Sequence, residues 1–180
     1  MSSICSSRDT FWGKMNNILY TRKEKISDIL FSVLGNRDAI SFIFLDCPPK
    51  KKIAENLTIK EGSFLIFDEF FEQISEYLDG KRKNFDIKTK PLIGTKFERT
   101  VWKKVADIPY GQVMTYGELA YSLGNRRLAR AVGQALGKNP LPVIIPCHRV
   151  VASSGKPGGF TAGIPLKLHL LKIEGVRYAQ

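Results

Sequence analysis

Residues 139–151 read NPLPVIIPCHRVV, an apolar run that ends in a cysteine with a histidine beside it. A buried cysteine is usually an inert small hydrophobic residue. Here Pro146 indicates a rigid turn rather than a central strand, and His148 and Arg149 place groups beside Cys147 that lower a thiol pKa. Neighbouring side chains on a strand point to opposite faces, so Cys147 and His148 need a turned backbone or a bridging water to work together. The pattern predicts a reactive thiol.

Two short helices joined by a tight turn are predicted before this stretch. Thr115 and Glu118 form a capping box, in which the threonine oxygen accepts an amide hydrogen and the glutamate reaches back. Asn125 can cap a second helix over 126–136, which Gly137 ends. This pattern is typical of a helix-turn-helix.

The second of these helices has one basic face and one apolar face. At 100° per residue, an arc of about 120° holds what we call the basic face: Arg126, Arg127, Arg130, Gly133 and Gln134. An ordinary amphipathic surface helix shows a similar separation. Three arginines with no acid on the helix, and a glycine that permits close backbone approach, favour contact with nucleic acid.

The charge of the chain is concentrated in the same region. The net charge is +11, and residues 91–180 carry 13 Lys and Arg against 4 Asp and Glu. A basic half of this kind suggests a polyanionic partner, although a generically basic protein would look the same.

Residues 153–163 are rich in glycine and serine and predict a loop that could wall a pocket. Pro165 suits the first turn of a final helix that Gly175 ends. Glu174 lies in the last turn, where the helix dipole disfavours a carboxylate. It could orient His148, or it could be an ordinary solvated glutamate.

The first half of the chain has a different character. Residues 40–45 predict a strand, residues 64–79 an amphipathic helix, and residues 85–87 a possible strand, which together indicate an α/β unit. A boundary is expected near 88–94, which gives an N-terminal domain over 1–90 and a C-terminal domain over 91–180. A second capping box, Thr95 with Glu98, opens the C-terminal part with a helix.

Three cysteines and two histidines occur, with no clustered metal-ligand pattern. An odd cysteine count argues against a disulfide framework and fits a reducing compartment. No apolar stretch is long enough for a membrane span, and the N-terminus lacks a signal-peptide pattern. We expect no metal, no cofactor and no membrane partner, and a cytoplasmic location.

The motifs together resemble the O6-alkylguanine-DNA alkyltransferases, also called methylated-DNA–protein-cysteine methyltransferases. The resemblance covers about residues 92–176. It is carried by PCHRV at 146–150, by the approach helix from Phe97 through Trp102 to Pro109 and Gly111, by TYGELA at 115–120, by ARAVG at 129–133, by Asn139-Pro140, by Gly163, and by the final pattern of Lys167, Leu170, Leu171, Glu174 and Gly175.

The resemblance implies a role for each matching residue. Cys147 would accept the alkyl group, His148 would take the thiol proton through a water, and Glu174 would hold the imidazole. Tyr116 would donate its hydroxyl to the leaving guanine, and Asn139 would link the helix-turn-helix to the active site. Arg130 would fill the space left by a flipped nucleotide, beside a DNA-binding set of Thr115, Arg126, Arg127, Ala129, Gly133 and Gln134.

The resemblance also implies a pocket and a fold. The substrate pocket would include Pro142, Val150, Phe160, Thr161 and Lys167. The fold would be an RNase H-like α/β N-terminal domain and a mainly α C-terminal domain with a winged-helix-like helix-turn-helix. Some members bind zinc in the N-terminal domain, but no histidine precedes His148 here, so we predict none.

The implied function is direct reversal of DNA damage. The protein would flip O6-alkylguanine out of double-stranded DNA and transfer the alkyl group to Cys147, and each molecule would react once. It would act as a monomer, either in the cytoplasm at the nucleoid or in the nucleus of a eukaryote. Two alternatives stay open. A cysteine hydrolase would use Cys147 and His148 but leaves the basic face without a role, and a pure DNA-binding module would not need the cysteine.

Overall fold

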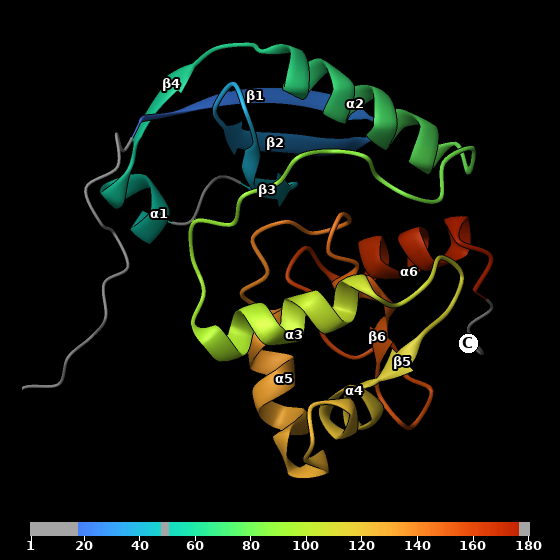
Figure 1. Ribbon diagram of the computed structural model, residues 1–180. Coiled ribbons are helices and arrows are strands. Elements are labelled where there is room, and N and C mark those ends of the chain that lie inside the picture. Colours follow the sequence, from blue (N-terminus) through green and yellow to red (C-terminus); the bar gives the residue numbers. More distant parts are fainter. Residues whose placement is uncertain (1–17, 48–50, 177–180) are drawn as a thin grey trace, which may run out of the picture.

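The computed structural model of the chain describes residues 18–47 and 51–176, and its first half is built on a four-stranded sheet (Figure 1). The antiparallel hairpin of β1 (Ile18–Ile26) and β2 (Ile29–Gly35) turns through Ser27 and Asp28, whose φ angles of 48° and 66° suit a tight hairpin turn. Antiparallel β3 (Ile40–Leu45) joins β2, and β4 (Thr58–Glu61) pairs in parallel with β1, so the strand order is β3-β2-β1-β4.

One long helix covers a face of this sheet. Helix α2 (Leu65–Leu78) confirms the prediction for 64–79, because its apolar residues recur at helical spacing and face the sheet. Phe67, Phe70 and Ile74 are fully buried there. The short helix α1 (Lys51–Asn56) precedes β4. We refer to β1 through α2 as the sheet half.

The predicted strand over 85–87 is wrong. The chain instead pairs with the edge of β3 two residues after the predicted strand. There the amide of Ile40 donates to the carbonyl of Lys88, and the carbonyl of Ile40 accepts from the amide of Lys90. These two bonds form only a single bridge, between Ile40 and Thr89. The apolar Phe85 and Ile87 that suggested a strand pack against the core as an irregular segment.

The second half of the chain is mainly helical. It contains α3 (Lys96–Ala106), α4 (Tyr116–Ser122), α5 (Ala129–Leu136) and α6 (Ile164–Ile173), and a small parallel pair of β5 (Met114–Thr115) and β6 (Val150–Val151). Both predicted capping boxes are present, at the starts of α3 and α4. We refer to α3 through α6 as the helical half. None of the helices within the described ranges is long and apolar enough to cross a membrane.

The helix predicted over 126–136 begins differently. Asn125 accepts from the amide of Arg127, but the turn it caps is the 3-10 helix η1 (Arg126–Leu128), and the α-helical part starts only at Ala129. The tighter turn places the first two arginines of the basic face before α5 rather than on it.

The two halves share one core. Leu141, Val143 and Leu170 of the second half are buried in the same cluster as Phe31 and Phe67 of the sheet half. The amide of Ile43 in β3 donates to the carbonyl of Pro140 at 2.8 Å. The segment that leads to Cys147 is therefore held directly by the sheet, and the division into domains at residue 90 stays a prediction.

Candidate active site

The backbone before Cys147 forms the rigid turn that the sequence predicts. Asn139 organises it: its side-chain oxygen accepts from the amide of Leu141, and its Nδ2 donates to the carbonyl of Ile145 at 2.9 Å and to Cys147 Sγ at 3.1 Å. Val143 has a φ of 75°, which a β-branched residue rarely adopts. Cys147 then opens the 3-10 helix η2 (Cys147–Arg149), so Cys147 and His148 lie on a turn and not on a flat strand.

Cys147 lies at the wall of a pocket of about 280 Å³. The pocket is lined by residues from α4, α5 and the loop before α6: Tyr116, Gly133, Leu136, Gly137, Cys147, Gly159, Phe160 and Thr161. Two hydrogen bonds hold the loop in place, from Tyr116 to the carbonyl of Gly159 at 3.4 Å and from Thr161 to the carbonyl of Gly137 at 3.3 Å.

Three residues predicted for the pocket are not among those that line it: Pro142, Val150 and Lys167. Lys167 is fully buried behind the pocket, where its Nζ donates to the carbonyls of Val150 at 2.5 Å and Gly159 at 3.4 Å. Burial lowers the pKa of Lys167 to about 8. Lys167 therefore links β6 to the loop at the pocket and does not line the pocket itself.

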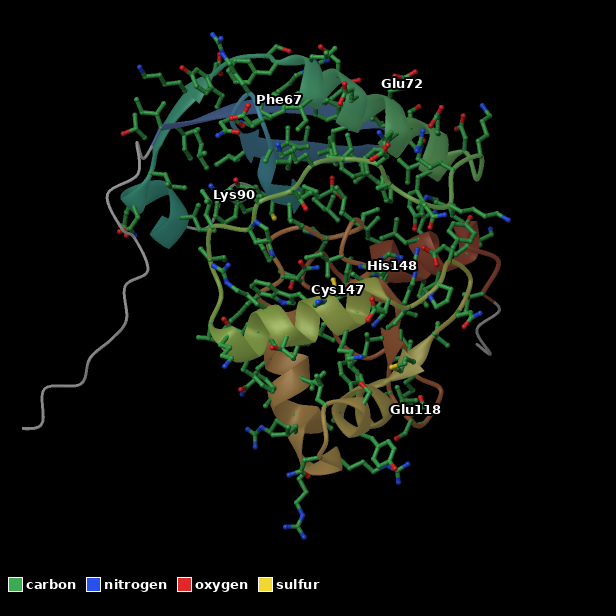
Figure 2. All side chains as sticks on the ribbon, viewed as in Figure 1. Phe67, Glu72, Lys90, Glu118, Cys147 and His148 are labelled. Carbon is green, nitrogen blue, oxygen red and sulfur yellow. The ribbon has the colours of Figure 1, made fainter. Side chains whose placement is uncertain are left out.

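His148 and Glu174 form the buried pair that the sequence suggested. His148 Nε2 lies 2.9 Å from Glu174 Oε1, and both side chains are fully inaccessible to solvent. Because an ionised carboxylate only accepts, Nε2 carries the proton in this contact and Nδ1 is left as an acceptor. Nδ1 is buried and has no hydrogen-bond partner. Figure 2 shows Cys147 beside α3 and His148 beside α6, where the helical half meets the sheet half.

Glu174 accepts hydrogen bonds from more residues than the sequence indicated. Arg149 donates through Nε and Nη2 to both carboxylate oxygens, Tyr77 donates to Oε1 at 2.7 Å, and the amide of Gly111 donates to Oε2 at 3.1 Å. Although burial opposes it, the hydrogen bonds from His148, Arg149 and Tyr77 hold the pKa of Glu174 at about 2. The glutamate at the end of α6 is ionised and fully partnered.

The thiol differs from the expectation of a lowered pKa. Burial raises the pKa of Cys147, and the hydrogen bond from Asn139 and the charge of Lys167 only partly oppose this. Arg149, which the sequence placed beside the thiol, directs its guanidinium to Glu174. Burial likewise lowers the pKa of His148 despite its bond to Glu174. The resting site therefore holds a neutral thiol and a neutral imidazole.

The basic face lies open to solvent. Arg126, Arg127, Arg130 and Gln134 are exposed, while Val132, Ala135 and Leu136 on the opposite side are buried. Ala129 starts α5, and Thr115 is held in the capping box with Glu118. Gly133 faces the pocket, where a Cβ would lie 3.7 Å from the Tyr116 ring. The basic face thus adjoins the pocket mouth.

Sequence reasoning missed two residues of this site. Tyr77 falls within the amphipathic helix predicted over 64–79, but nothing in the sequence marks its hydroxyl, whose partner Glu174 lies 97 residues further along the chain. The contact of Gly111 with Glu174 uses a backbone amide, for which the sequence carries no side-chain signal.

Comparison with known proteins agrees with this geometry. The profile of the family described as "6-O-methylguanine DNA methyltransferase, DNA binding domain" matches residues 96–176. A methylated-DNA–protein-cysteine methyltransferase of Methanosarcina acetivorans is 45% identical over 141 residues, which cover 78% of this chain and 88% of that protein. The chain belongs to the methylated-DNA–protein-cysteine methyltransferase family.

Solved structures of this methyltransferase family extend the likeness to both halves of the chain. The crystal structure of the Mycobacterium tuberculosis O6-methylguanine methyltransferase has a TM-score of 0.76 at 32% identity and covers 87% of this chain and 92% of that one. The M. tuberculosis protein in complex with DNA gives a TM-score of 0.75 at 31% identity, with the same coverage.

Proposed function

We propose that this chain repairs alkylated DNA by moving the alkyl group of O6-alkylguanine onto Sγ of Cys147. The observation that carries the proposal is the pocket itself, which has a thiol in its wall and a buried His148–Glu174 pair behind that thiol. Membership of the family supports the reaction type, and the described residues supply a group for each step.

The transfer is a displacement at carbon. The thiol proton passes to His148 Nδ1 through a water, the sulfur lone pair forms a bond to the alkyl carbon, and the bond from that carbon to O6 breaks with its electron pair going to the guanine. Tyr116 donates toward the departing base, and the purine finally carries the proton that the thiol gave up. The stable S-alkyl-cysteine has no leaving route, so each molecule reacts once.

The neutral resting state fits this chemistry. A thiol whose pKa is raised by burial is a poor target for reagents in bulk water, because only the thiolate is a good nucleophile. The acceptor that it needs is His148 Nδ1, which burial keeps unprotonated near neutral pH. The site is ready for a proton transfer that is completed when the alkylated base fills the pocket.

The partner would be double-stranded DNA that carries the alkylated base. The target carbon is inaccessible inside a duplex, so the nucleotide is flipped, at a cost of a few kcal/mol. The exposed basic face would contact the backbone from the minor groove, with Arg130 in the vacated stack. Thr115, Ala129, Gly133 and Gln134 would line this contact.

The proposal also includes the fold type of each half. The order β3-β2-β1-β4, with β4 parallel to β1, supports an RNase H-like sheet half. The β5–β6 pair beside α4 supports a winged-helix-like helical half. The protein would act as a monomer, without a cofactor, where the chromosome lies: in the cytoplasm at the nucleoid, or in the nucleus of a eukaryote.

Intact-mass spectrometry with a duplex that carries one O6-methylguanine tests the function. The protein should gain one methyl group, located on Cys147 by peptide mapping, with one turnover per molecule. Cys147→Ala should bind the duplex without gaining mass. Cys47→Ala is the matched control, because Cys47 is an exposed free cysteine that does not line the pocket, and it should react like the wild type. Repeated turnover would indicate a hydrolase, and binding with an unmodified Cys147 would indicate a binding module.

A further inference from the structure

The C-terminal end of α2 reaches the active site from the other half of the molecule. Figure 1 shows this end of the helix above α6, and the contact is made by Tyr77, which is fully buried. Its hydroxyl donates to Glu174 Oε1 at 2.7 Å, and its oxygen lies 3.3 Å from His148 Nε2. Tyr77 thus touches both members of the pair that the thiol depends on.

We propose that Tyr77 is a positioning residue for alkyl transfer: its hydroxyl shares the Glu174 carboxylate with His148 and keeps the imidazole neutral and oriented to receive the thiol proton. The inference rests on the proposed function and gives the sheet half a part in it.

The contacts at Nε2 orient the ring of His148. Its Nε2 faces two oxygens, Glu174 Oε1 and the Tyr77 hydroxyl, which come from opposite sides of the interface between the halves. Two acceptors around one N–H fix the direction of that bond, and the direction of Nδ1 on the other side of the ring is fixed with it. No group of the described residues hydrogen-bonds to Nδ1, so the contacts at Nε2 orient it.

The Tyr77 hydroxyl also acts on the charge of the Glu174 carboxylate. Tyr77 is a neutral donor, and burial beside Glu174 raises its pKa, so it stays protonated. A donor to the ionised carboxylate lowers the affinity of the His148–Glu174 pair for a proton. Without it, the carboxylate would stabilise an imidazolium more strongly, and His148 would be occupied by a proton before the thiol could deliver one.

Other charged and titratable groups around the pair do not replace Tyr77. Arg149 in η2 binds the same carboxylate, Lys167 of α6 adds a positive charge, and Cys147 is neutral. Tyr110, after α3, packs its ring against Tyr77 but donates its hydroxyl to the carbonyl of Ile173. Only Tyr77 reaches both Oε1 and Nε2 with a neutral hydroxyl among the contacts described for this cluster.

Tyr77→Phe removes the hydroxyl and keeps the ring. The single-turnover rate of methyl transfer, measured between pH 5 and pH 8, should fall on the acid side as His148 becomes protonated. In Tyr77→Phe the midpoint of this fall should lie about one pH unit higher than in the wild type. At pH values below both midpoints, the variant should therefore react about tenfold more slowly than the wild type. Tyr110→Phe is the matched control: it also loses one hydroxyl hydrogen bond, which is partly buried and does not involve the pair, and it should leave the midpoint where it is. A purely structural role would lower the rate equally at every pH.

Nitrogen-15 NMR of the two histidines gives a readout independent of DNA. The protonation midpoint of His148 should rise by about one unit in Tyr77→Phe, and the exposed His169 should not move. If the wild type transfers no methyl group, the proposed function fails while this titration still tests the role of Tyr77. An unchanged His148 midpoint, or an equal change in Tyr110→Phe, would overturn the inference.

A second variant keeps the test decisive if Tyr77→Phe does not fold. Incorporation of 3-fluorotyrosine at position 77 retains the hydroxyl and makes it a stronger donor. The midpoints of His148 and of the rate profile should then move down, opposite to the phenylalanine variant. No movement, or movement upward, would contradict the proposal.

Discussion

Replacement of Glu174 by glutamine should destabilise the protein by about 3 kcal/mol at neutral pH. Bonds from His148, Arg149 and Tyr77 hold the pKa of this buried carboxyl at about 2, against an ordinary value of 4.5. At about 1.4 kcal/mol per pKa unit, the difference contributes about 3 kcal/mol to the free energy of unfolding. The loss of one partner from a buried ion pair, which here leaves Arg149 uncompensated, costs ~3–5 kcal/mol, so the two routes agree.

The destabilisation caused by Glu174→Gln should become smaller as the pH falls. A lowered pKa in the folded state contributes stability above the unfolded value of 4.5, and this stability is lost as the pH falls toward 2. The gap between the wild type and Glu174→Gln should therefore narrow by about 2 kcal/mol between pH 7 and pH 3. His148, whose pKa burial lowers from 6.5, makes the wild type less stable in the same direction, beginning below pH 6.5.

Urea unfolding followed by circular dichroism at pH 7 and pH 3 measures both quantities. Glu72→Gln is the control, because Glu72 is exposed on α2, and its effect should stay within about 0.5 kcal/mol. A loss below about 1 kcal/mol for Glu174→Gln at pH 7, or the same loss at both pH values, would refute the reasoning.

Three further predictions concern the pocket and DNA. Arg130→Ala should slow methyl transfer from duplex DNA by about tenfold in single-turnover assays, and transfer from the free base should change much less; an equal loss on both would contradict the stacking role. Duplex affinity, measured by fluorescence anisotropy, should fall about 40-fold between 50 and 200 mM salt if the three exposed arginines of the basic face each neutralise a phosphate. Gly158→Ala should slow transfer, because its Cβ would meet the Tyr116 ring at 2.8 Å at a φ of 71°. Gly155→Ala, with a φ of 78° and nothing within 4 Å, is the control that shares the strain but not the clash.

Local patterns in the sequence predicted local structure well. The capping boxes at Thr95 and Thr115 are present, since a capping box involves residues only three apart. Helix α2 and strand β3 lie where their apolar spacing places them. In the site, His148 and Glu174 meet as the position of Glu174 at the end of α6 suggested.

Features that depend on distant residues were not predictable in the same way. The strand expected over 85–87 fails because the edge of β3 is met at Lys88 and Lys90, and pairing of that kind is decided by the whole sheet. The pKa of Cys147 was expected to fall from the charge of Arg149, yet Arg149 is engaged by a carboxylate 25 residues away. Tyr77 carries no sequence signal beyond its place on an apolar helix face.

The buried cluster behind the pocket is satisfied at every side-chain oxygen and nitrogen except one. Within residues 18–47 and 51–176, the one buried side-chain nitrogen or oxygen without a hydrogen-bond partner is His148 Nδ1. Four residues donate to the Glu174 carboxylate on one side of the imidazole ring, whereas none of the described residues donates to Nδ1 on the other side. A protein donor at Nδ1 would occupy the lone pair that the proposed proton transfer needs. In the proposed mechanism Nδ1 accepts, through a water, the proton of the neutral, buried Cys147. The donors around the pair bind other acceptors: Tyr77 and Arg149 bind the Glu174 carboxylate, and Lys167 binds the carbonyls of Val150 and Gly159.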